Sequence, residues 1–247
     1  MFTSIVARLR QAGCVFAEEE AELLIATADG PEALDAMVAR RVDGYPLEQV
    51  LGWAEFCGLR VTLRPGVFVP RRRSEFLVEQ AVARGGSVVV DLCCGSGAIG
   101  LAIATALPGA ELHAADLDPL AVACARDNLP GGHVHQGDLF DALPAALVGR
   151  VELLVVSPPY VPTGAIALLP AEAREHEPRV ALDGGADGLD LVRRVAARAD
   201  RWLAPGGWLL VETSERQAET ARQILGGQAE VLVDDERDAT VVARVTA

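Results

Sequence analysis

The spacing of hydrophobic and polar positions changes near residue 86 of the chain. Beyond it, seven short apolar runs rich in valine and leucine alternate with longer stretches of helical periodicity, at 87–92, 110–116, 133–138, 151–157, 207–213, 229–234 and 240–245. Strands separated by helices pair in parallel through crossover connections, so the pattern predicts a doubly wound α/β sheet. Only "DERDA" separates the last two runs, which predicts an antiparallel hairpin at the end of the sheet.

The first part of the chain has a different pattern. Apolar residues recur at helical spacing over 4–12, 18–28 and 32–41, whereas 51–63 contains two short apolar runs about Gly58 and predicts a β-hairpin. We therefore predict a small N-terminal helical region with a hairpin over residues 1–70, and a main domain over residues 71–247 that opens with a helix over 75–83.

Composition narrows the class of protein. The chain has 247 residues, is 51% hydrophobic and carries a net charge of −13, which argues against a broad contact with a nucleic-acid backbone. No run approaches the roughly 18 to 20 apolar residues that span a bilayer, and the first residues lack a basic segment ahead of an apolar one, so we expect a cytoplasmic protein without a membrane partner. His133 and His135 have no third ligand nearby, and we predict no metal site.

The stretch "VVVDLCCGSGAIGLAIA" predicts a buried strand, a glycine-containing turn and a helix. Gly95 and Gly97 allow close approach of a ligand to the backbone, and "GSGAIG" also matches the G-x-G-x-x-G fingerprint of dinucleotide-binding proteins. Asp91 favours a different ligand, because a carboxylate at this strand end repels a pyrophosphate but suits a sulfonium and an ammonium group. S-adenosyl-L-methionine carries both cations, so we predict it as the cofactor; the alternative is that Asp91 caps a loop.

The second and third strands also end in aspartate. Asp116 lies about 20 residues beyond the glycine turn, where an acid can accept hydrogen bonds from ribose hydroxyls, and Asp138 is placed to accept one from the adenine amino group. The predicted cofactor-binding residues are Asp91, Cys93, Gly95, Ser96, Gly97, Asp116, Leu117, Asp138, Leu139 and Ser157.

The fourth strand ends in Ser157, Pro158, Pro159 and Tyr160, the predicted catalytic residues. This sequence resembles the [DNS]-P-P-[YFW] motif of methyltransferases that act on planar nitrogen groups. The resemblance implies that the first side chain and the carbonyl of the first proline accept hydrogen bonds from the NH2 group, while the tyrosine packs on the planar group. Catalysis then comes largely from positioning and electrostatic complementarity.

Further segments are similar to the protein-glutamine N-methyltransferase family, of which release factor glutamine methyltransferases are members. They are "VFVPRRRSEFLVEQA", "EHEPRVALDGGADGLDLVRRV" and "GGWLLVETSERQ" with Glu212. The resemblance implies a seven-stranded class I S-adenosylmethionine methyltransferase sheet, a glutamine-bearing protein substrate such as a release factor or ribosomal protein, and substrate-binding roles for Arg71, Glu75, Glu177 and Pro178.

The chain also departs from this family. Ser157 stands where asparagine is usual, Cys93 replaces the first glycine of the cofactor turn, and R-R-R-S-E replaces R-P-[DE]-T-E. The N-terminal helical region is shorter than usual. Four alternatives therefore stay open: a small-molecule or peptide natural-product N-methyltransferase, a DNA or RNA amino-methyltransferase, a non-catalytic cofactor-binding subunit, and a dinucleotide oxidoreductase.

Overall fold

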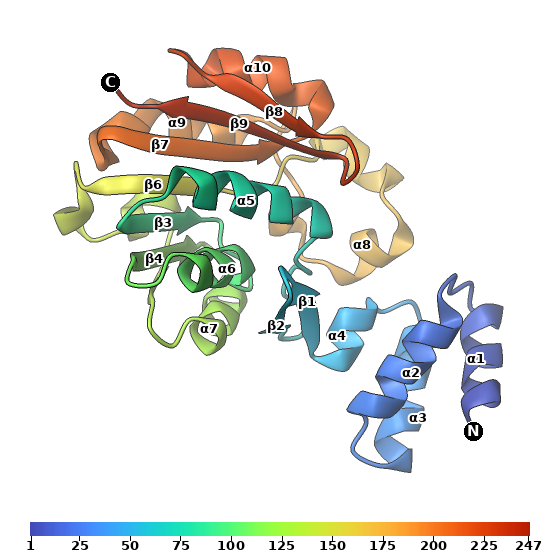
Figure 1. The fold of residues 1–247 in the computed structure, drawn as a ribbon. Coiled ribbons are helices and arrows are strands. Elements are labelled where there is room, and N and C mark those ends of the chain that lie inside the picture. The colour runs from blue at the N-terminus through green and yellow to red at the C-terminus, as the bar shows by residue number, and fades with distance from the viewer.

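A seven-stranded sheet forms the centre of the structure, a computed structural model that describes residues 1–247 (Figure 1). The strand order is β5-β4-β3-β6-β7-β9-β8, with parallel pairing from β5 to β7 and an antiparallel β9 between β7 and β8. The strands are β3 (Val88–Leu92), β4 (Glu111–Asp116), β5 (His133–Gln136), β6 (Val151–Val156), β7 (Leu203–Thr213), β8 (Glu230–Asp234) and β9 (Ala239–Val245). The predicted doubly wound sheet with its final antiparallel hairpin is thus confirmed.

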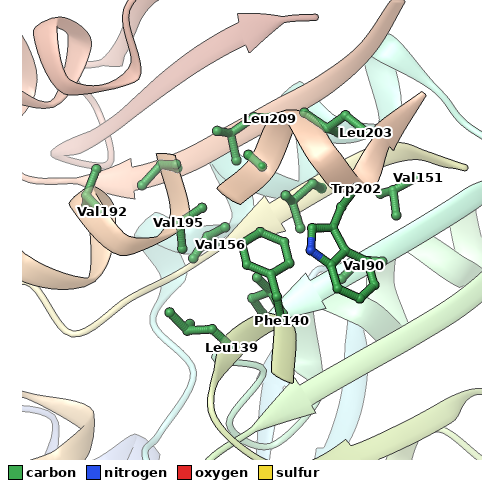
Figure 2. Packing of buried hydrophobic residues seen from close by; sticks show 14 of the residues in the cluster. Val90, Leu139, Phe140, Val151, Val156, Val192, Val195, Trp202, Leu203 and Leu209 are labelled. Carbon is green, nitrogen blue, oxygen red and sulfur yellow. The ribbon is translucent and has the colours of Figure 1, made fainter. Parts of the chain in front are cut away.

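Helices cover both faces of the sheet, because the apolar side chains of β3 point alternately to its two faces. Val90 packs with the layer that contains α9 (Asp190–Trp202) and α10 (Glu215–Leu225), whereas Val89 packs with α5 (Glu75–Arg84), α6 (Ala98–Ala106) and α7 (Pro119–Asn128). Figure 2 shows the first layer, where the rings of Phe140 and Trp202 stack with their centroids 5.4 Å apart. Because side chains alternate along a strand, Asp91 faces the same layer as Val89 and lies beneath α6.

The N-terminal helices form a separate small bundle (Figure 1). Its helices are α1 (Phe2–Gln11), α2 (Ala17–Thr27), α3 (Pro31–Val42) and the short α4 (Leu47–Leu51). The first three were predicted from their periodicity, whereas five residues in α4 are too few to show one. Leu9, Leu24 and Val38 are fully buried in a core whose buried residues all come from this bundle.

The predicted hairpin consists of β1 (Trp53–Phe56) and β2 (Leu59–Thr62), which pair antiparallel. Cys57 and Gly58 connect them with φ angles of 51° and 70°, the left-handed conformation that a two-residue hairpin turn of this type needs. Phe56 and Val61 are buried in the same core cluster as α5. The hairpin therefore packs on the main domain, and the boundary at residue 70 stays a prediction.

None of the helices combines the length and the continuous apolar surface that crossing a bilayer requires.

Candidate active site

A cavity of about 1110 Å³ lies at the carboxyl ends of the parallel strands. It is centred where the strand order reverses between β3 and β6, the place at which open α/β sheets commonly bind ligands. Most of the residues predicted from the sequence line it: Arg71, Cys93, Gly95, Ser96, Asp116, Leu117, Asp138, Leu139, Ser157, Pro158, Pro159, Tyr160, Glu177 and Pro178. Asp91, Gly97 and Glu75 are not among the lining residues.

The turn between β3 and α6 forms one wall of the cavity. Cys93 adopts a φ of 59°, which side-chain-bearing residues rarely do, and this explains why glycine suits the position. A Cβ added at Gly95 would meet only open space, whereas one added at Gly97 would lie 3.2 Å from the Ala125 backbone of α7. Gly95 therefore leaves room for a ligand, and Gly97 lets α6 pack closely on α7.

Asp91 lies beneath this turn and is fully buried. Its Oδ2 accepts a hydrogen bond of 3.0 Å from the Gly100 amide, but its Oδ1 is buried without any hydrogen-bond partner. Burial raises the pKa of this carboxyl to about 7, and the nearby Asp116 acts in the same direction. An unpartnered buried oxygen with no cation beside it suits a positively charged ligand above the turn; a direct contact with the cofactor stays a prediction.

Asp116 ends β4 and faces the cavity. Its two carboxylate oxygens accept hydrogen bonds of 2.9 Å from the amides of Gly95 and Asp118, so it also holds the shape of the glycine turn. Burial raises the pKa of Asp116, although these amide donors act against it. A carboxylate fixed in this way retains free lone pairs for hydroxyl groups of a ligand.

Asp138 and Leu139 follow β5 at the same edge. The Asp138 carboxylate pairs with Arg194 of α9 at 2.7 Å, a contact that no local pattern predicted. Leu139 adopts a φ of 49° and is buried in the cluster of Figure 2, yet it also lines the cavity. The cavity, the open space at Gly95 and the acidic residues at three strand ends fit S-adenosylmethionine in size and charge.

Ser157 stands at the end of β6, beside the end of β7. The strands are in register up to Val156 and Val211, so Ser157 lies next to Glu212, and its hydroxyl donates to Glu212 Oε2 at 2.8 Å. The other oxygen, Oε1, accepts from the Ser74 hydroxyl at 3.0 Å. Glu212 is 3% exposed, and burial raises its pKa while the two serines and Arg73 lower it.

The backbone of the proline motif is held from the outer side. The Gln217 amide donates to the Tyr160 carbonyl at 2.9 Å, and a glycine-rich segment packs so closely that a Cβ at Gly188 would lie 2.1 Å from that carbonyl oxygen. Pro158 lines the cavity, and no hydrogen bond within the protein reaches its carbonyl. Tyr160 is half-buried, and burial raises the pKa of its hydroxyl.

After the motif the chain forms η4 (Thr163–Leu168), α8 (Ala171–His176) and η5 (Arg179–Ala181), and residues of α8, η5 and the stretch between them form the outer wall of the cavity. Glu177 is buried and accepts from Arg71 Nη2 at 2.5 Å and from the Val69 amide at 3.3 Å. Arg71 also lies 4.8 Å from the centre of the Phe68 ring. These contacts join the region ahead of α5 to this outer wall.

Glu75 has a different position from the one expected of a substrate-binding residue. Its Oε1 accepts from the Cys57 amide at 2.9 Å and so joins α5 to the hairpin turn. Its substrate-binding role stays a prediction that the cavity geometry does not support.

Several residues that line the cavity were not predicted from the sequence, among them Phe68, Ser74, Arg194 and Glu212. Glu212 had a usable signal, since it is an acidic residue near the carboxyl end of a predicted strand, as Asp91 and Asp116 are. Ser74 stands at the threonine position of the R-P-[DE]-T-E motif, but that pattern does not show that it meets Glu212. Arg194 had no signal, because it lies in a helical segment and reaches the site only through tertiary packing.

The known proteins whose sequences are similar to this chain are methyltransferases. The family "Methyltransferase small domain" matches residues 58–172. The release factor glutamine methyltransferase of Geobacter sulfurreducens is 43% identical over 199 residues, which are 77% of this chain and 69% of that protein. The 4-amino-L-phenylalanine/4-methylamino-L-phenylalanine methyltransferase of Streptomyces pristinaespiralis is 39% identical over 191 residues, which are 73% of this chain and 65% of that protein.

A solved structure shares the fold. The 16S rRNA N2 G1207 methyltransferase of Thermus thermophilus, in complex with AdoMet and guanosine, superposes with a TM-score of 0.57 at 21% identity, over 79% of this chain and 50% of that one. At this identity the likeness concerns the fold alone.

Proposed function

The chain belongs to the release factor glutamine methyltransferase family, and we propose that its acceptor is the glutamine of a Gly-Gly-Gln segment in a peptide-chain release factor. It is an S-adenosylmethionine-dependent protein-glutamine N-methyltransferase. The observation that carries the proposal is that Ser157, Pro158 and Tyr160 line the same cavity as the glycine turn and Asp116. Donor and acceptor sites thus share one enclosed space.

The geometry supports a positioning mechanism. The Ser157 hydroxyl oxygen and the Pro158 carbonyl are two acceptors for the two hydrogens of the glutamine NH2, and Tyr160 is the flat surface beside them. The cofactor, when bound, supplies an electrophilic methyl group on a sulfonium. An amide nitrogen is a poor nucleophile because its lone pair is delocalised, so holding both hydrogens and aiming the nitrogen at the methyl is the main contribution of these residues.

A small molecule is the second candidate for the methyl acceptor, because the chain departs from the family's usual motifs. Ser157 is shorter than asparagine, and the relative from Streptomyces pristinaespiralis is named for an amino acid with an aromatic amine. Such an amine also presents two N–H hydrogens to the same two acceptors. We propose the protein acceptor because the G. sulfurreducens release factor methyltransferase is 43% identical over 77% of the chain.

The test offers both acceptors to the same enzyme. The protein is incubated with labelled S-adenosylmethionine and a release factor from its own organism, its Gln→Glu variant, or 4-amino-L-phenylalanine. We expect label on the release factor only when the glutamine is present. Label on the aromatic amine alone would refute the proposed acceptor.

Variants connect that activity with the site. Tyr160→Ala should remove transfer to the release factor and retain binding of S-adenosylhomocysteine in calorimetry, because Tyr160 lies beside the acceptor position. Unchanged transfer in this variant would contradict the assignment. A cytoplasmic location belongs to the same proposal, and the five free cysteines agree with it.

Nucleic acid enters the proposal only as part of a substrate complex, because the chain carries a net charge of −13. In a lysate incubated with labelled methyl donor, we expect a labelled protein band that survives nuclease treatment. Loss of the label with nuclease would favour a nucleic-acid acceptor.

A further inference from the structure

Two serine hydroxyls, from distant parts of the chain, converge on one buried carboxylate. Ser157 lies at the end of β6 and Ser74 just ahead of α5, and they donate to Glu212 over 2.8 Å and 3.0 Å respectively. Glu212 is 3% exposed, the two hydroxyls are its hydrogen-bond donors, and the charge of Arg73 also acts on it. An ionised carboxylate only accepts hydrogen bonds.

We propose that Glu212 is a positioning residue that makes Ser157 an obligatory hydrogen-bond acceptor toward the substrate, so that the site selects acceptors bearing N–H hydrogens. A serine hydroxyl can otherwise rotate and either donate or accept. Because its single hydrogen is committed to Glu212, only lone pairs of Ser157 Oγ remain for a group in the cavity. The inference rests on the proposed function, since it concerns the acceptor half of that site.

This arrangement explains how serine can replace the usual asparagine. An asparagine side chain has a carbonyl oxygen that can never donate, whereas serine acquires that property only from a fixed partner. The buried carboxylate is such a partner, and its position beside Ser157 follows from the parallel register of β6 and β7. A substrate group with only lone pairs, such as a carboxylate, would face the Ser157 oxygen without a hydrogen between them.

The experiment is a double-mutant cycle on release factor methylation. Glu212→Leu removes the acceptor of the Ser157 hydrogen, and Ser157→Ala removes the group on which Glu212 is proposed to act. The assay is run at pH 8, well above the ordinary pKa range of a carboxyl, because burial raises the pKa of Glu212. Calorimetry with S-adenosylhomocysteine checks in each variant that the fold and the cofactor site are retained.

We expect Glu212→Leu to lower kcat about 10- to 100-fold, because a substrate nitrogen that is held out of line with the methyl group reacts more slowly by a factor of that order. The same substitution should have no further effect in the Ser157→Ala background, since residues that act as a unit are not additive. Ser74→Ala is the matched control: it removes the other hydroxyl from the same carboxylate, and in that background Glu212→Leu should retain its full effect.

If Glu212→Leu lowers kcat by the same factor in the Ser157→Ala background as in the parent protein, the proposal is wrong and Glu212 has a structural role. If the leucine variant does not bind S-adenosylhomocysteine, Glu212→Met, which has a similar length and no oxygen, takes its place and the same dependence on Ser157 is expected. If the parent protein methylates no release factor, the proposed function fails. The same double-mutant cycle is then measured with 4-amino-L-phenylalanine as the methyl acceptor. Because its amine is also an N–H donor, this measurement tests the role of Glu212 independently of the proposed function.

Discussion

Replacing Asp91 with asparagine should stabilise the protein without its cofactor at pH 8. Burial raises the pKa of Asp91 from 3.8 to about 7. The folded chain therefore binds a proton that the unfolded chain has already released, and the free energy of unfolding falls as the pH rises from about 4 to 7. A shift of this size corresponds to about 4 kcal/mol at pH 8. Asparagine cannot ionise, and its side-chain oxygen can still accept from the Gly100 amide.

Urea denaturation of parent and variant at pH 4.5 and pH 8 measures this effect. We expect Asp91→Asn to be more stable at pH 8 by about 2 to 4 kcal/mol, since local relaxation reduces the full value, and the difference to shrink below about 1 kcal/mol at pH 4.5. Asp235→Asn, an equal charge change at an exposed position, should leave the difference between the two pH values unchanged. The same pH dependence in parent and Asp91→Asn would refute the reasoning.

The opposite effect is expected on cofactor binding. A buried carboxylate without a cationic partner attracts the positive groups of S-adenosylmethionine, and such a charge pair contributes about 1 to 4 kcal/mol. Asp91→Asn should therefore weaken cofactor binding at pH 8 at least tenfold in calorimetry, although it stabilises the free protein. Unchanged affinity would mean that Asp91 serves only to hold α6 through Gly100.

Two further predictions concern the backbone of the proline motif and the stability of the N-terminal bundle. Gly188→Ala should lower kcat for methyl transfer at least tenfold with little change in S-adenosylhomocysteine binding, because its Cβ would lie 2.1 Å from the Tyr160 carbonyl oxygen. The control is Gly164→Ala, whose added Cβ meets nothing within 4 Å. Equal kinetics in both variants would contradict the argument. Arg41→Met should destabilise the N-terminal bundle by about 2 kcal/mol, since Arg41 is only 13% exposed and pairs with both Glu20 and Glu172 of α8. Arg8→Met, which removes an exposed ion pair, should destabilise it by at most about 0.5 kcal/mol. Hydrogen exchange in α1 to α3 checks the second prediction, and equal protection in the Arg41→Met and Arg8→Met proteins would refute it.

The strands and the cofactor edge of the site were predictable from the sequence. Short apolar runs rich in valine and leucine mark buried strands, and parallel strands place their carboxyl ends at one edge, so Asp116, Asp138 and Ser157 had to meet there. The short α4 was missed because five residues do not show a helical period. β7 begins at Leu203, ahead of the predicted start at Gly207, because a register shift against β6 accommodates the extra residues.

Side-chain partners were not predictable in the same way. Glu75 was assigned to the substrate by its place in a motif, but in three dimensions it holds the Cys57 amide. Asp91 was correctly placed at a strand end, but which of its oxygens has a partner depends on the packing of α6.

The sequence by itself therefore determined the order of strands and helices and the acidic residues at the carboxyl edge, because these follow from local periodicity and from the polarity of parallel strands. Only the tertiary structure decided that Ser74, Ser157 and Glu212 form one hydrogen-bonded group. These residues are up to 138 positions apart along the chain. Their meeting depends on the register between β6 and β7 and on how α5 packs across the sheet, neither of which any local pattern records.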